Sequence, residues 1–199
     1  MIIVFNWLQD SFQKIDIVIS KSKIKLIASL SQKKFRDETG LFIAEGTKLV
    51  TDLVPAFQCF LLIATPQWLA ENNDIKADEI LEADIDEIKK ISNQKSPQGV
   101  LAVFRQPVYT YNPLELNQKL SLALDDVQDP GNLGTILRIA DWFGISTIVC
   151  STNTADCFNP KVVQATMGAI ARLKIIYCNL QEVLKDARSR NIPIFGTFM

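Results

Sequence analysis

The stretch LSLALDDVQDPGNLGTILRIADWFGISTIVC, residues 120–150, decides the fold class. It opens with an apolar run that ends in two acidic residues, and a Pro-Gly pair then marks a turn. Apolar residues recur after that turn at helical spacing as far as Gly144, and a second apolar run follows at 145–150. A strand, a helix and a strand in this order predict a parallel α/β unit.

The alternation of strands and helices continues on both sides of this stretch. Asn159 and Pro160 are typical of a helix start. We expect strands at 41–46, 57–64, 98–104, 120–126, 145–150, 173–178 and 192–198, and helices at 47–54, 66–71, 132–143, 158–172 and 180–191. Prolines and tyrosines interrupt the pattern at 105–119. The chain should therefore hold two α/β units, and the strand–helix repeat predicts an open, mostly parallel sheet.

The composition excludes several classes of chemistry. The chain of 199 residues has no histidine, which removes Ser-His-Asp and Cys-His catalysis and histidine zinc sites. Its net charge of −1 provides no global basic field, so any nucleic-acid contact needs a local patch. The four cysteines form no CxxC pair, which favours free thiols and a cytoplasmic location.

Neither the N-terminal segment nor the length of the apolar runs suggests a membrane protein. Residues 1–20 are apolar, but they lack an initial positive charge and are interrupted by Asn6, Gln9 and Asp10. No apolar run approaches the roughly 20 residues that span a bilayer. We therefore expect a short amphipathic helix there and no membrane partner.

Two segments carry concentrated charge. Residues 21–36 hold six cations and no acid, and apolar residues at helical spacing place these cations on the outer faces of a helix and the turn after it. Residues 71–88 are strongly acidic, and we interpret them as a solvated face.

Chemistry is expected where the helix of the opening stretch begins. A helix that starts after a strand points backbone N–H groups outward, which predicts a possible anion site. Periodicity places Arg138 off the core face and near Asp141, where it could simply form a surface pair. Asn132 could simply be the N-cap of the helix.

Two motifs carry a resemblance to a known family. DDVQDPGNLGTILRIADWFGI, residues 125–145, closely resembles the first motif of the SpoU (TrmH-like) class of SPOUT RNA 2′-O-ribose methyltransferases. FNPKVVQATMGAIARLKI, residues 158–175, resembles the segment that follows it in that family. Residues 22–50 and 95–104 resemble the small L30e-like domain that often precedes the catalytic domain.

The resemblance implies a domain organisation. It places an α/β L30e-like RNA substrate-binding domain at 19–106, a linker at 107–118 and the N-terminal part of a SPOUT parallel-sheet domain at 119–199. Residues 1–18 have no counterpart and are an unassigned extension.

The resemblance also implies an activity. Family members transfer a methyl group from S-adenosylmethionine to a ribose 2′-hydroxyl of ribosomal or transfer RNA, without a metal, and work as homodimers. Asn132 and Arg138 take the positions of the functional Asn and Arg, and Gly196 and Thr197 should touch the cofactor. The basic segment would then contact RNA phosphates, or remain a solubilising face; its members are Lys21, Lys23, Lys25, Lys33, Lys34 and Arg36.

One departure limits that implication. The later family motifs, which form the knot, most of the cofactor pocket and much of the dimer contact, have no match in residues 1–199. We therefore expect a C-terminally truncated member with impaired activity, poor cofactor binding and weakened dimerisation. A non-catalytic RNA-binding fragment is the main alternative, and a generic α/β anion-binding module is a third.

Overall fold

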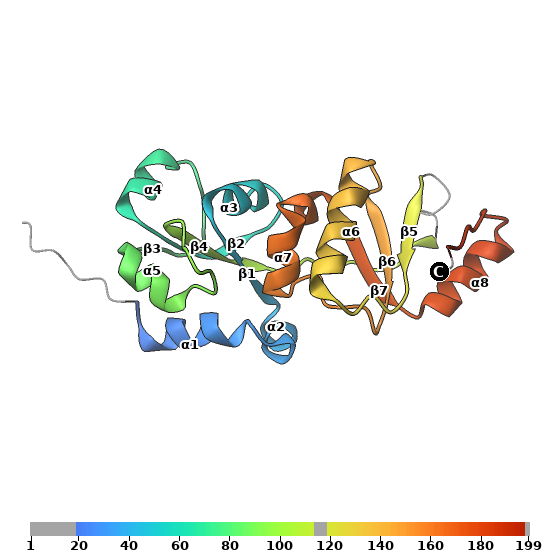
Figure 1. The fold of residues 1–199 in the computed structure, drawn as a ribbon, viewed down its shortest axis with the longest axis horizontal. Coiled ribbons are helices and arrows are strands. Elements are labelled where there is room, and N and C mark those ends of the chain that lie inside the picture. Colours follow the sequence, from blue (N-terminus) through green and yellow to red (C-terminus); the bar gives the residue numbers. More distant parts are fainter. Residues whose placement is uncertain (1–18, 114–118, 198–199) are drawn as a thin grey trace, which may run out of the picture.

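The computed structural model describes residues 19–113 and 119–197. The strands gather in two sheets along the long axis of the molecule, with α6 and α7 between them in Figure 1. Within the described ranges, no helix is long and apolar enough to cross a membrane.

The first sheet has the strand order β1-β4-β2-β3, from β1 (Leu41–Glu45), β4 (Val100–Arg105), β2 (Cys59–Ala64) and β3 (Ile80–Glu82). Strand β4 is antiparallel to both of its neighbours, and only β2 and β3 are parallel. This half is therefore a mixed sheet, unlike the parallel sheet expected for the second half, because the chain reaches β4 through a loop and runs back in the opposite direction.

Alternation along these strands separates two helical layers. One face packs with α3 (Thr47–Leu53) and α4 (Pro66–Glu71), through residues such as Phe42 and Leu62. The opposite face packs with α1 (Lys21–Ser29) and α5 (Ile85–Ile91), through residues such as Ile43 and Leu61. The period of two in a strand produces this division.

The acidic run 71–88 is more than a solvated face. It contains β3 and the start of α5, where Asp84 and Glu87 form a capping box. Each of the two carboxylates accepts a backbone N–H of the other residue. Acidic residues in this run therefore begin a helix, as the favourable interaction of carboxylates with a helix N-terminus predicts.

The second sheet is parallel throughout, as the opening stretch predicts. Its order is β5-β6-β7, from β5 (Ser121–Leu124), β6 (Thr147–Ser151) and β7 (Lys174–Cys178). Helices α6 (Pro130–Trp142) and α7 (Pro160–Thr166) cover one face, and α8 (Leu180–Ser189) covers the other. The helix expected at 158–172 is divided, because Met167 and Gly168 have positive φ and only a short 3-10 helix, η2 (Ala169–Arg172), follows.

The strand expected at 192–198 is wrong for the described part of that segment. Residues 192–197 are not in a strand, and Phe195 is 91% exposed. Asn191 turns the chain with a φ of 58°, and the Ile192 N–H then bonds back to Ala187 in α8. An apolar sequence becomes a strand only when it joins a hydrogen-bonded ladder, and this segment is turned back towards α8.

One buried cluster joins the two sheets. Phe42 of β1 packs on Phe158, which precedes α7, with ring centroids 4.7 Å apart. Helix α7 also packs against β1. The two halves therefore share apolar core rather than only a polar contact.

Candidate functional site

Helix α6 carries both residues predicted to act on RNA. Asn132 lies in its first turn and Arg138 six residues later, and both are exposed. The helix keeps this face outward because Leu133, Leu137 and Ala140 are buried on the other side. The two side chains therefore lie on a surface that a large ligand can reach.

The local partners of these two residues differ from the expectation. Asp129, and not Asn132, is the N-cap of α6, since its carboxylate accepts the Asn132 N–H at 2.7 Å. Asp141 does not pair with Arg138, because Arg172 binds it through two nitrogens. Arg138 Nη1 instead lies 3.0 Å from the Met167 sulfur. A thioether is a weak acceptor, so this contact leaves the charge of Arg138 largely available.

A depression of about 460 Å³ adjoins Asn132. It is lined by the loop after β5 and by the first two turns of α6, namely Asp126, Val127, Gln128, Asp129, Asn132, Thr135 and Ile136. Two carboxylates make this depression negative, and one of them already occupies the helix N-terminus. The Asp129 carboxylate therefore takes the place at the helix N-terminus where an anion was expected.

Hydrogen bonds to the end of β6 and the turn after it fix the loop that lines this depression. Asp126 has a φ of 54°, and its N–H donates to Ser151 Oγ. The Ala155 N–H donates to the carbonyl of Val127 at 2.8 Å. The β5–α6 loop is thus tied to the turn that follows β6.

Gly196 and Thr197 lie elsewhere. Both are exposed, and neither lines the depression beside Asn132. The structure does not bring them together with Asn132 or Arg138, because the strand that should carry them is not formed. The described lining of the depression therefore does not complete a cofactor site.

The basic segment divides into exposed lysines and one buried arginine. Lys21 and Lys25 are exposed on α1, and Lys23 pairs with Glu79. Lys33 and Lys34 are exposed on α2 (Lys33–Thr39), each near a carboxylate four residues later.

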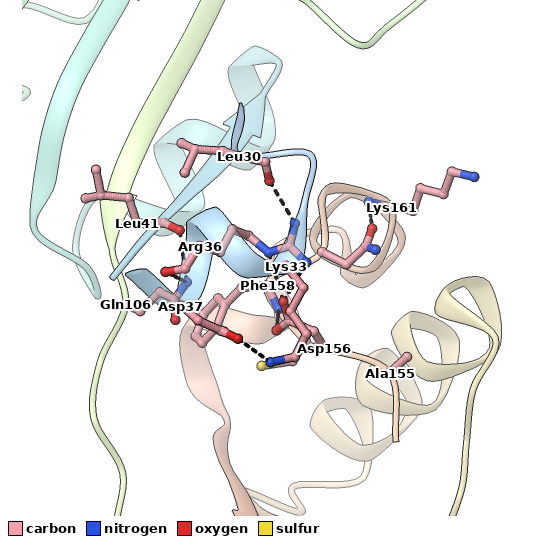
Figure 2. Close-up of polar contacts among 12 residues, drawn as sticks. Leu30, Lys33, Arg36, Asp37, Leu41, Gln106, Ala155, Asp156, Phe158 and Lys161 are labelled. Atoms are coloured by element: carbon pink, nitrogen blue, oxygen red, sulfur yellow. Dashed lines mark hydrogen bonds and ion pairs between the residues drawn. The ribbon is translucent and has the colours of Figure 1, made fainter. Parts of the chain in front are cut away.

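Arg36 points inward and cannot contact RNA. It is 1% exposed, and it forms an ion pair with Asp156. Its Nη1 also donates to the Leu30 carbonyl at 2.8 Å, as Figure 2 shows. The expectation of an RNA contact at Arg36 is therefore wrong, because α2 turns this residue towards the second half of the molecule.

Comparison with known proteins finds a matching family model for each half of the chain. The family model described as the SpoU rRNA Methylase family matches residues 119–199, and the MRM3-like substrate binding domain matches residues 21–102. A protein of the TrmH RNA methyltransferase family from Porphyromonas gingivalis superposes with a TM-score of 0.79 at 39% identity, covering 88% of this chain and 69% of that one. The chain belongs to the SpoU rRNA methylase family.

Further relatives of this SpoU-family chain are ribosomal RNA methyltransferases by name. The AdoMet-bound rRNA methyltransferase from Sinorhizobium meliloti has a TM-score of 0.71 at 36% identity, with 86% of this chain and 68% of that one covered. Mitochondrial rRNA methyltransferase 3 from Xenopus laevis is 34% identical over 76% of this chain. The chain spans about two fifths of the length of such mitochondrial relatives, 38% in that case and 43% for Xenopus tropicalis.

Sequence reasoning missed the residues that support this SpoU site. Asp156 carried no signal, since a single acid in a turn resembles any surface acid. The turn around it is rigid, because Tyr177 Oη accepts the Cys157 N–H at 2.8 Å and donates to the Ala155 carbonyl. Burial raises the pKa values of Tyr177 and Cys157, so both stay neutral and structural.

Glu45 has a structural role. It is buried at the end of β1, where it accepts bonds from Ser92 Oγ and from the Asn93 N–H. The loop that it holds reaches the second half, since Gln94 Nε2 donates to Gln164 of α7 at 3.0 Å. Glu45 therefore shapes the junction and does not face a substrate.

Proposed function

We propose that this chain acts in the transfer of a methyl group from S-adenosylmethionine to a ribose 2′-hydroxyl of RNA, with ribosomal RNA as the first candidate. The observation that carries the proposal is that Asn132 and Arg138 are both exposed on α6, within the motif of the family. The names of the relatives support it, including the 23S rRNA (guanosine(2553)-2′-O)-methyltransferase RlmP of Bacillus subtilis, 28% identical over 88% of this chain.

Arg138 would act as a cation that binds the RNA backbone. A guanidinium stays protonated at neutral pH, so it is a poor base but a good partner for a phosphate and for a developing alkoxide. The contact between Arg138 Nη1 and the Met167 sulfur occupies one of the five N–H donors of the guanidinium. Arg138 would therefore hold the RNA and stabilise negative charge on the ribose oxygen.

Asn132 would orient the ribose or Arg138. Six residues of helix separate the two positions by about 9 Å along the axis. Its amide can donate and accept together, and the N-cap role of Asp129 leaves that amide out of the capping of α6. S-adenosylmethionine supplies the electrophilic methyl group when bound, and Gly196 and Thr197 remain candidates for its contact.

The proposal is tested by measuring methyl transfer from labelled S-adenosylmethionine to ribosomal and transfer RNA. We expect Arg138→Lys to lower kcat about 100-fold, because an ammonium cannot replace a planar fork aimed at developing charge. Arg172→Lys is the matched control, since that arginine is exposed nearby but pairs with Asp141. Near-normal turnover in Arg138→Lys would reject the role.

A second candidate function is RNA binding without catalysis. The position of Gly196 and Thr197 away from the depression favours it. The same assay separates the two, since this candidate predicts RNA binding by the wild-type chain without any methyl transfer.

We also propose that a second copy of the chain covers the apolar C-terminal end of α6. Ile139, Trp142 and Phe143 are 49%, 85% and 74% exposed there, beside Arg138. Exposed apolar groups of this size mark interaction surfaces. Sedimentation should show a dimer that Trp142→Lys converts to a monomer, and a wild-type chain that is monomeric at every concentration would contradict the proposal.

A further inference from the structure

The contact between α2 and the turn after β6 contains the one cation that is buried in the described part of the chain, Arg36. Its Nε and Nη2 donate to Asp156 Oδ2 at 2.8 and 2.7 Å, as drawn in Figure 2. Asp156 is itself mostly covered, with 13% of its side chain exposed. Two charges are thus desolvated at the junction of the two sheets, 120 residues apart in sequence.

The pair is connected to the candidate site through short hydrogen bonds. Asp156 Oδ1 accepts the Phe158 N–H, which fixes the turn. The preceding residue, Ala155, donates its N–H to Val127, which lines the depression beside Asn132. The turn that holds Asp156 is therefore hydrogen-bonded to the loop from which α6 begins.

The other side of the pair belongs to the helix that presents cations to solvent. Lys33 and Lys34 are 65% and 76% exposed on α2, one turn before Arg36. One short helix therefore carries candidate RNA contacts on its outer side and the junction contact on its inner side.

An ion pair is suited to fixing the position of one half of the molecule relative to the other. Apolar contacts such as Phe42 on Phe158 tolerate small sliding movements, whereas a guanidinium aimed at one carboxylate oxygen is directional. A buried ion pair is weak evidence for stability, because the cost of desolvating two charges offsets their attraction.

We propose that Arg36 and Asp156 are positioning residues, which fix the RNA bound by α2 in register with Asn132 and Arg138. The inference rests on the proposed function. The pair touches no reacting atom, and it acts through the 155–158 turn and the β5–α6 loop.

The test uses Asp156→Asn in the full chain, because asparagine keeps Oδ1 for the Phe158 N–H and loses the charge. Below the melting range of every variant, we expect kcat to fall at least about ten-fold while the RNA Kd stays within about two-fold, since small misplacements far from the reacting atoms reduce alignment. The matched control is Asp86→Asn, which breaks an exposed ion pair with Lys89 in α5. A purely stabilising role predicts unchanged kcat in the folded variant, and that result would overturn the proposal.

Two further measurements keep the proposal decidable. The double variant Arg36→Met with Asp156→Asn leaves no unpaired buried charge, so it serves if the single variant does not fold. Hydrogen exchange at residues 125–132 needs no substrate, and we expect it to be faster in Asp156→Asn than in Asp86→Asn. If the wild-type chain transfers no methyl group, the proposed function fails, and equal exchange in the two variants would then separately refute the coupling.

Discussion

At the scale of single residues, the basic segment shows what periodicity can and cannot decide. The spacing of Ile24, Ile27 and Leu30 correctly places the lysines of α1 outward. Helix α1 ends at Ser29, and α2 starts a new helix at Lys33. The helical phase does not continue through that turn, so the pattern could not show that Arg36 lies inside.

The two site residues also needed more than a pattern. Physical reasoning from the sequence placed Arg138 off the core face, which the structure confirms. It assigned the wrong partner and the wrong N-cap. Asp141 pairs with Arg172, which lies 31 residues further along the chain, and Asp129 caps the helix in place of Asn132. Only the family motif pointed to a catalytic use of Asn132 and Arg138.

The exposed lysines of α2 provide a residue-scale prediction. Each phosphate contact contributes about 0.7 to the slope of log affinity against log salt for single-stranded nucleic acid. The double variant Lys33→Ala with Lys34→Ala should therefore lower the slope for RNA binding by about 1.4. Lys89→Ala with Lys90→Ala, on α5, is the control. An unchanged slope in the α2 variant would show that these lysines only solubilise the chain.

At the scale of elements, long periodic segments were predictable and context-dependent ones were not. The β5–α6–β6 unit matches the prediction from the opening stretch. The weak strand β3 was missed, because its residues are exposed or half-exposed and carry no apolar alternation. The strand at 192–198 was predicted from composition, but a ladder depends on a neighbour that composition does not reveal.

The packing of α6 on α7 supports an element-scale prediction. A Cβ at Gly134 would lie 2.5 Å from the Ala165 Cβ and 3.0 Å from the Val162 carbonyl oxygen. Alanine improves helix propensity by about 1 kcal/mol over glycine, but rigid overpacking of this kind costs about 1–3 kcal/mol, and we expect overpacking to win because both contacts are close to backbone.

Denaturant unfolding of Gly134→Ala would measure this balance. The midpoint should fall, whereas Thr135→Ala, an exposed neighbour on the same helix, should change stability by no more than about 0.5 kcal/mol. A higher stability of Gly134→Ala would show that α6 and α7 can move apart without a loss of folding free energy.

At the scale of the whole molecule, the shared cluster joins the two sheets into one unit of stability. Apolar residues of β1, α3 and β4 belong to the same buried cluster as those of α6, α7 and β7. This continuity makes the arrangement of the two halves part of the fold, and it gives the Arg36–Asp156 pair two connected bodies to align.

Phe158 is the residue through which this continuity can be tested. Its ring packs on Phe42 across the junction, while it is only partly buried. We expect the wild-type chain to unfold in one calorimetric transition. Phe158→Ala should cost about 2–3 kcal/mol, below the usual value for a fully buried phenylalanine, and should separate the unfolding of the two halves.

The control for this experiment is Phe195→Ala. That ring is 91% exposed, so its loss should leave both the midpoint and the single transition unchanged. Two transitions in the wild-type chain would mean that the shared cluster does not couple the halves. An alignment role for Arg36 and Asp156 would then depend on the ion pair alone, which is directional but too small a contact to make two independent units unfold together.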